Sequence, residues 1–130
     1  MLPELLERAI TEFNARRYAS AEAAAREGAS LAATAGGRDA LFWSGLHETC
    51  WGFALLMDHK LGPAEAKMAS AIEKLRNFGY VYNELEVTSV LAGLRQGVEE
   101  IRHVRQKRKT QFDVTLLPNL KLAARADNNR

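Results

Sequence analysis

The residue types and spacings suited to chemistry gather in one apolar segment, residues 40–57. Ser44, His47, Glu48 and Trp51 are three and four positions apart, which places them on one side of a helix. A carboxylate in such a segment is costly to bury unless it is protonated, hydrogen-bonded or paired. The spacing therefore marks a candidate polar pocket.

Two interpretations of this cluster are open. In the functional one, the cluster and Glu22 of the preceding helix line a pocket for a small ligand, with His47 or Glu48 as acid or base. In the structural one, the same side chains form a buried network that fixes helix register, or a strip that reaches solvent. The structural interpretation is favoured, because no complete catalytic set is present. The partners expected for Glu48 are His47, Arg17, Arg26, Tyr80 and Tyr82.

Two further arrangements carry weaker signals. Cys50 lies three residues after His47, but a reactive thiolate needs an electropositive, partly open setting, so a core cysteine is expected in this apolar run. Glu100 and His103 have the Glu-x-x-His spacing of di-iron bundles, which require a second such motif that the chain lacks. Neither a metal nor a cofactor is predicted.

A basic run comprises Arg102, Arg105 and residues 107–109. Such a cluster can contact phosphates, but the dipole favours cations at any helix C-terminus, and the only nearby aromatic residue is Phe112. The net charge is only +2. Nucleic-acid binding is therefore not expected.

The composition is that of one globular domain: 130 residues, of which 47% are hydrophobic and 26% charged. The single cysteine excludes an intramolecular disulfide and favours a reducing cytoplasm. The first residues, Met1–Glu4, carry no basic stretch and do not resemble a signal peptide. Residues 40–57 approach the length of a membrane span, but His47 and Glu48 at their centre favour a buried core helix. A cytoplasmic protein without a membrane segment is predicted.

Apolar residues recur at helical spacing in five segments, so a compact all-α bundle of about five antiparallel helices is expected. The third expected helix is apolar around almost its whole circumference and should be central. The second expected helix is rich in alanine, which allows a neighbouring helix to approach it closely. The joint near Asn14 resembles the helix-turn-helix of tetratricopeptide units, although the period of about 34 residues is not repeated. The expected helices span about 2–13, 18–33, 39–60, 63–78 and 84–107.

Several residues are expected to end or cap these helices. Gly36 should end the second, Asp39 should cap the third, and Gly62–Pro63 should end the third and start the fourth. Asn83 and Glu86 have the spacing of a capping box. No segment alternates with period two, so no strand is expected.

The organisation predicted is a helical domain over residues 1–109 and a C-terminal tail over 110–130. Residues 112–122 are notably apolar for a tail and are expected to fold back over the bundle, or to dock onto a partner or a second copy. The end of the tail is expected to be disordered. The candidate docking residues are Phe112, Leu116, Leu117 and Leu120.

Short motifs resemble the domain of unknown function 309 family of small all-helical proteins. They are Phe13–Asn14 at the end of the first helix, Tyr18 and Ala21 in the second, residues 44–48 in the central helix, and 62–66 at the next turn. The resemblance covers about residues 5–78. It implies a helical fold of that kind.

The departures from the family pattern fall on its polar positions. Glu22–Ala23 stands where the family has His-Glu, and Ser44 and Glu48 stand where it has glutamines. Because the function of the family is unassigned, the resemblance implies a fold and carries no activity to this chain.

The function predicted is a non-catalytic helical interaction or scaffold module that forms a homodimer or binds a protein partner through the tail or a groove. The alternative is a small-molecule-binding or hydrolytic bundle built on His47 and Glu48. An enclosed pocket lined by both residues would favour the alternative, and a filled core would favour the interaction module.

Overall fold

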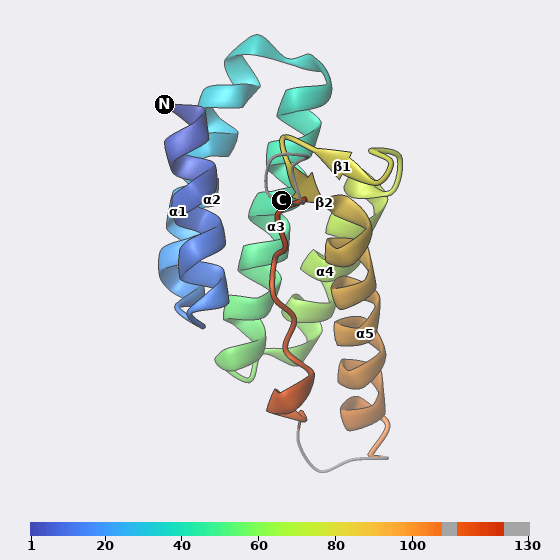
Figure 1. Cartoon of the computed structure of the whole chain (residues 1–130). Helices are drawn as coiled ribbons and strands as arrows, with labels where there is room; N and C mark the ends of the chain where they lie inside the picture. The colour runs from blue at the N-terminus through green and yellow to red at the C-terminus, as the bar shows by residue number, and fades with distance from the viewer. Residues whose placement is uncertain (108–111, 124–130) are drawn as a thin grey trace, which may run out of the picture.

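The central helix, α3 (Gly37–Met57), is covered by its neighbours on most of its surface. The computed structural model describes residues 1–107 and 112–123, to which all structural statements refer. The protein is an all-α bundle of five helices, as predicted, in which each helix packs mainly on the next in sequence (Figure 1). The other helices are α1 (Leu2–Asn14), α2 (Tyr18–Ala35), α4 (Leu61–Leu75) and α5 (Val87–Arg105), with a 3-10 turn, η1 (Val114–Leu116).

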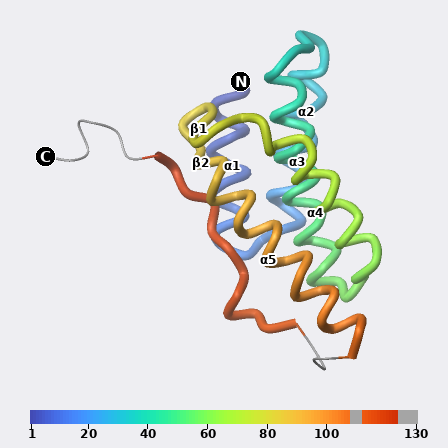
Figure 2. Tube along the Cα trace, turned by 90° about the vertical axis from the view of Figure 1, so that its right-hand side faces the viewer, coloured from blue at the N-terminus to red at the C-terminus, as the bar shows by residue number. Residues whose placement is uncertain are grey.

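The helices lie in two layers. In Figure 1, α2, α3 and α4 form the rear, and α1 and α5 stand in front on either side of α3. Figure 2 shows that the tail runs beside α5 toward the end of the bundle at which α5 begins. The front of α3 is thus covered by a tail segment rather than by a sixth helix.

The core is continuous from α1 to α5 and has aromatic side chains at its centre. Phe13 of α1, Tyr18 of α2 and Phe53 of α3 contact one another, with ring centroids 5.0–5.9 Å apart. Aromatic rings bury large apolar areas, so this contact fixes how the α1–α2 pair sits on α3.

The expectation that the chain has no strand is wrong. Residues 81–86 form an antiparallel hairpin of β1 (Val81–Tyr82) and β2 (Leu85–Glu86). The turn residues Asn83 and Glu84 both have positive φ, 49° and 66°, as a type I′ turn requires. The Tyr82 ring packs on Phe42 and Phe78, with centroids 4.8 Å from each. The sequence does not predict the hairpin because Glu84 stands at the second turn position, where a type I′ turn usually has glycine.

Two of the predicted caps at the hairpin end are also wrong. Asp39 lies inside the first turn of α3, whose N-cap is Gly36, and accepts hydrogen bonds from Tyr82 Oη at 3.3 Å and Asn83 Nδ2 at 3.2 Å. Asn83 is a hairpin residue, and α5 begins after Glu86 without a side-chain cap. Asp39 and Asn83, which were expected to cap helices, therefore form hydrogen bonds between α3 and the hairpin instead.

The α3–α4 joint comprises residues 58–60 and lies earlier in the chain than the predicted joint at residues 61–62. α3 ends at Met57, and His59 makes the turn with a φ of 61°. α4 begins at Leu61, so Gly62 and Pro63 lie within its first turn and Gly62 is not a C-cap. Gly36, with a φ of 72°, does end α2 as predicted.

Gly28 lets α2 approach α3 closely. A Cβ at this position would overlap the six-membered ring of Trp43, a rigid side chain that is fully buried. We expect Gly28→Ala to lower the free energy of unfolding by about 1–2 kcal/mol, because overpacking outweighs the gain of up to about 1 kcal/mol in helix propensity. Urea unfolding measures the change.

Gly62→Ala is the matched control for this substitution. A Cβ at Gly62, also helical, would meet nothing within 4 Å. The control should leave stability unchanged or raise it by up to about 1 kcal/mol. Equal effects of the two substitutions would contradict a steric role for Gly28.

α4 and α5 are joined by one carboxylate and two guanidinium groups. Glu65 accepts hydrogen bonds from Arg102 Nε at 2.9 Å and Arg105 Nη1 at 2.8 Å. The hydrogen bond from Arg102 and that from Arg105 lower the pKa of Glu65 below its usual value, more than burial raises it.

Because the pKa of Glu65 is lowered on folding, its carboxylate stabilises the fold above the pKa of the unfolded chain, and this contribution is lost as pH falls through the folded-state pKa. We expect Glu65→Gln to lower the free energy of unfolding at neutral pH, and the difference from the unmodified protein to shrink on acidification. Urea unfolding at several pH values measures it. A difference independent of pH would mean that packing, not charge, is lost.

Candidate functional site

Four of the five residues of the predicted polar pocket lie on α3, where it meets α2 and α4, and the fifth, Glu22, lies on α2. The five residues belong to two separate groups. In the first, His47 Nε2 lies 2.7 Å from Glu22 Oε2, and Glu22 also pairs with Arg26 Nε at 3.1 Å. The His47 ring stacks on Trp51, with centroids 5.3 Å apart, and Lys67 Nζ of α4 lies 3.8 Å from the centroid of that indole. His47 is thus held on one side by a carboxylate and on the other by an aromatic face.

The second group answers the question of what pairs with Glu48. Ser70 Oγ donates to Glu48 Oε1 at 2.7 Å, and Lys74 Nζ lies 3.0 Å from the same oxygen. Lys74 also donates to Ser44 Oγ at 2.8 Å. The partners therefore come from α4, whereas the expected Arg17 pairs with Glu12. The other partners expected for Glu48 also contact other residues: His47 and Arg26 bond to Glu22, Tyr80 to Glu86 and Tyr82 to Asp39.

This geometry favours the structural interpretation of the cluster. His47 and Glu48 are only 17% and 13% exposed, and each is held by a different neighbouring helix. A cavity of about 470 Å³ does open elsewhere in the molecule, but none of the five predicted pocket residues lines it. A shared acid–base pair would need both side chains to face one space, and they do not.

The weaker candidates are also placed by the structure. Cys50 is fully buried, and burial raises the pKa of its thiol so that it stays protonated. His103 Nδ1 lies 3.7 Å from Glu100 Oε2 on α5. Within residues 1–107 and 112–123, no group of three or more His, Cys, Asp or Glu side chains is arranged to hold a metal ion. Arg102 and Arg105 of the basic run bind Glu65, and residues 108 and 109 lie outside the described residues.

The tail has the most specific contacts in the described structure. Residues 112–123 lie between α1 and α5, over α3, on a surface that we call the tail groove (Figures 1 and 2). Leu120 is 3% exposed and belongs to the core, and Phe112 and Leu117 pack against it. Leu116 is half-buried. Of the two predicted arrangements, the structure has the tail folded back, whereas the predicted disorder of its end falls on residues 124–130, outside the described residues.

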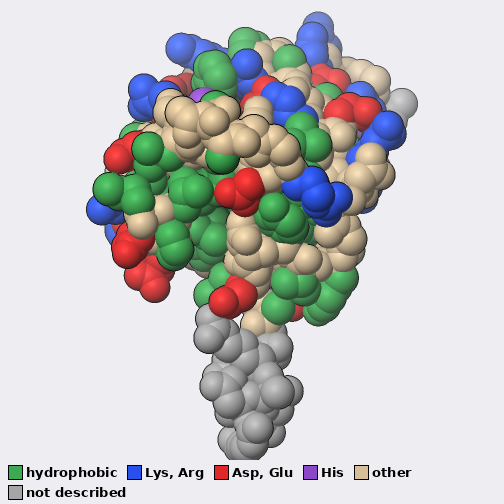
Figure 3. Space-filling model, turned by 90° about the horizontal axis from the view of Figure 1, so that it is seen from above, with side chains coloured by type: hydrophobic (Ala, Val, Ile, Leu, Met, Phe, Trp, Pro, Cys, Tyr) green, Lys and Arg blue, Asp and Glu red, His purple; other side chains and the backbone are tan. Residues whose placement is uncertain are grey.

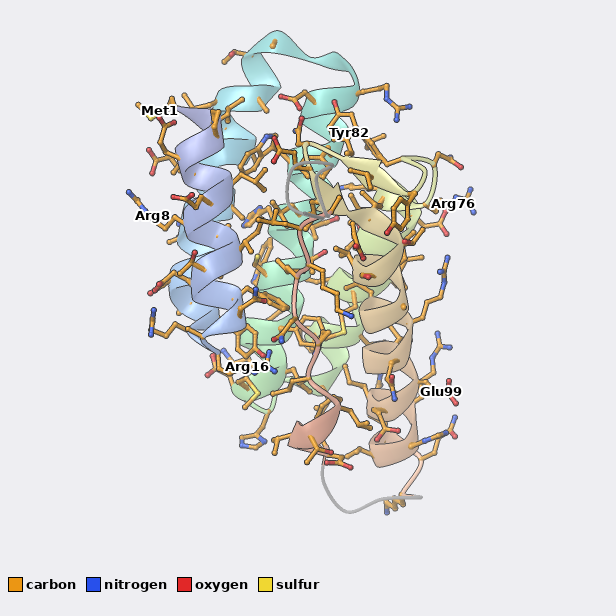
Figure 4. All side chains as sticks on the ribbon, viewed as in Figure 1. Met1, Arg8, Arg16, Arg76, Tyr82 and Glu99 are labelled. Atoms are coloured by element: carbon orange, nitrogen blue, oxygen red, sulfur yellow. The ribbon has the colours of Figure 1, made fainter. Side chains whose placement is uncertain are left out.

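Two side chains, one from the last residue of α1 and one from the turn that follows it, bind the backbone of the tail. Asn14 Nδ2 donates to the Leu120 carbonyl at 3.0 Å, and Asn14 Oδ1 accepts from the Leu120 N–H at 2.7 Å. The Asn14 amide thus pairs with one residue as a neighbouring strand would. Arg16 Nη1 and Nη2 donate to the carbonyls of Pro118 and Leu117 at 2.6 and 3.2 Å. Figure 4 shows Arg16 at the lower end of α1, on the side facing the tail.

The hairpin continues this recognition along the chain. The Glu86 N–H donates to the Lys121 carbonyl at 2.8 Å, and the Ala123 N–H donates to the Glu84 carbonyl at 2.7 Å. Leu122 forms an antiparallel bridge with Leu85. The end of the tail therefore pairs with β2 through one antiparallel bridge and the flanking backbone hydrogen bonds, a type of pairing that proteins also use to bind extended peptides.

Asn14 and Arg16 were not predicted as site residues. The sequence predicts that the first helix ends near Asn14, and Arg16 lies in the turn that follows, with a φ of 66°. Their partners lie more than 100 positions away in the sequence. No local pattern marks such a contact; the only sequence signal was an apolar tail with no helical period.

No helix in the described part of the chain combines the length and the hydropathy needed to cross a membrane. No protein-family model, no curated protein and no solved structure matches the chain. Membership of the domain of unknown function 309 family therefore stays a prediction that rests on the short motifs alone.

Asn14→Ala tests the hold on the tail. The substitution leaves both backbone groups of Leu120 without their partner, at a cost of about 1–3 kcal/mol. We expect hydrogen exchange at the Leu120 amide to accelerate sharply, while amides in α3 keep their protection. Exchange followed by NMR measures both.

Asn77→Ala provides the control for this substitution, because Asn77 is exposed and lies beyond the end of α4. It should leave exchange in the tail unchanged. An unchanged rate at Leu120 in Asn14→Ala, or an equal loss of protection throughout the bundle, would contradict a local role for Asn14.

Proposed function

We propose that the protein is a non-catalytic interaction module whose tail groove binds extended apolar segments. One observation carries this proposal: Asn14 makes both of its hydrogen bonds to the backbone of Leu120. Apolar contacts alone would be enough to bury the tail. This surface also forms hydrogen bonds with the backbone N–H and C=O groups of an extended segment. Backbone contacts supply affinity for any such segment.

Side-chain contacts supply the selectivity of the groove. Leu120 enters the core, and Pro118 lies against Gly93 of α5, where a Cβ would come within 2.7 Å of the proline ring. Arg16 adds charge-assisted hydrogen bonds to the carbonyls before Asn119. The preferred segment therefore carries a proline and, two residues later, a leucine.

We further propose that the occupant supplied in trans is the tail of a second copy, which makes the protein a homodimer by exchange. The same segment then satisfies the same groove, so no new surface is required. The covalently attached tail has an effective concentration of the order of mM, which explains why it occupies its own groove first. Cys50 is buried in its reduced form, and we place the protein in the cytoplasm.

A hydrolytic bundle built on His47 and Glu48 is not favoured. Each side chain is held by a neighbouring helix, Glu22 of α2 for His47 and Ser70 and Lys74 of α4 for Glu48. These contacts account for both polar side chains without a substrate.

The groove can be tested with the complete chain. A site for a sequence-specific protease replaces residues 108–111, and the folded protein is cut there. A fluorescent peptide of residues 112–123 is then added to cut and uncut protein. We expect anisotropy to rise with the cut protein only, because cutting removes the advantage of the attached tail. Asn14→Ala should weaken binding to the cut protein about 5- to 150-fold, and Asn77→Ala should not.

The alternative outcomes are distinguishable. A tail fragment that stays bound through gel filtration is itself an occupant in trans and supports the groove. Loss of helix on release of the fragment, followed by circular dichroism, would show that the bundle does not stay folded without the tail and would overturn the proposal. So would a folded, cut protein that rebinds neither the fragment nor the labelled peptide.

A further inference from the structure

Gly93 lies inside α5, on the side of the helix along which the tail runs (Figure 2). A Cβ at this position would come within 2.7 Å of Pro118 Cβ and 2.9 Å of Pro118 Cγ. Apart from the neighbourhood of Gly93 in α5 itself, no other atom of the described residues lies within 4 Å of that point. The absence of a side chain at Gly93 therefore makes room for the tail alone.

Four other glycines in the helices have a different role. A Cβ at any of them would press on a side chain of a neighbouring helix, so each allows two helices to approach closely. Glycine inside a helix has a lower helix propensity than alanine, and at Gly93 no helix–helix contact in the described structure offsets that cost. The contact with the tail is what accounts for a glycine here. The four others are Gly28, Gly45, Gly52 and Gly97.

Pro118 is held against α5 by the rest of the tail groove. Arg16 Nη1 donates to its carbonyl at 2.6 Å, and two residues later Leu120 is buried, with Asn14 bound to its backbone. The pyrrolidine ring is itself rigid, and α5 is fixed because Leu94 is fully buried. An added side chain would therefore force the tail off these contacts.

The contacts at the end of the tail are less selective. Leu122 is 57% exposed at the end of the bundle where α1 begins, and Figure 3 shows hydrophobic side chains gathered on that face. Apolar contact is non-directional, and the hydrogen bonds between the hairpin and residues 121 and 123 involve backbone atoms alone. The shape of the segment is therefore tested where Pro118 meets α5.

We propose that Gly93 is the specificity-determining residue of the tail groove. It admits a segment whose proline ring packs directly on the backbone of α5, and any side chain at that position excludes this segment while leaving the helices in place. For the tail of the same chain, the inference stands on the contacts of Gly93 and Pro118. For a segment supplied in trans, it rests on the proposed function, and it narrows the partner to a second tail that carries the same proline.

Hydrogen exchange in the intact chain tests this inference. Four proteins are compared: the unmodified chain, Gly93→Ala, Pro118→Gly and the double variant. The added methyl group overpacks the contact with the proline ring, so Gly93→Ala should accelerate exchange at the Leu120 amide about 5- to 150-fold while α3 keeps its protection. In the Pro118→Gly background, where no ring is present, the same substitution should change the rate by less than about twofold.

Gln96→Ala is the matched control on α5. Gln96 is exposed and lies three residues after Gly93 in the same helix. This substitution should leave exchange at the Leu120 amide unchanged in both backgrounds.

Three results would overturn the assignment of Gly93. They are equal acceleration by Gly93→Ala in both backgrounds, no acceleration in either, and a matching loss of protection in α3. The labelled-peptide experiment fails independently of this one. Coupling between Gly93 and Pro118 in the intact chain, together with a cut protein that does not bind the peptide, would overturn binding in trans and leave Gly93 in control of how the chain binds its own tail.

Discussion

The structure depends on one constraint, which is that α3 is apolar around most of its circumference and has to be covered on every side. α2 and α4 cover its flanks, and Gly28 allows α2 to reach the face of Trp43. α1 and α5 lie on either side of α3, and the tail runs between them (Figure 1). The apolar tail covers this side of α3 with Leu120, so the docking of the tail follows from the same hydrophobic demand that assembles the helices.

The polar residues of α3 obey the same constraint. Where the edge of α3 meets α2 and α4, its polar side chains are paired: His47 with Glu22, and Glu48 with Ser70 and Lys74. Partly buried charges are tolerated when such partners are present, and these partners also fix the register of the neighbouring helices. The polar cluster that the sequence marks as a candidate site therefore connects α3 to α2 and α4.

The tail then acquires a second property from the way it is bound. Apolar contacts alone would hold it by its side chains, but Asn14, Arg16 and the hairpin bind its backbone. That mode of binding suits any extended segment of similar shape, which is the basis for the interaction role that we propose. A cavity beside Leu122 lies at the end of the same segment.

The sequence alone determined the five helices and the central position of α3, because helical periodicity and apolar content are local properties. The sequence also indicated that residues 112–122 are too apolar for a disordered tail and contact either the bundle or a partner. Only the tertiary structure decided that α4 supplies the partners of Glu48, that Asn14 pairs with Leu120, and that Asn83 turns a hairpin. Those contacts join residues distant in sequence or depend on a left-handed backbone held by packing, and neither leaves a periodic pattern in the chain.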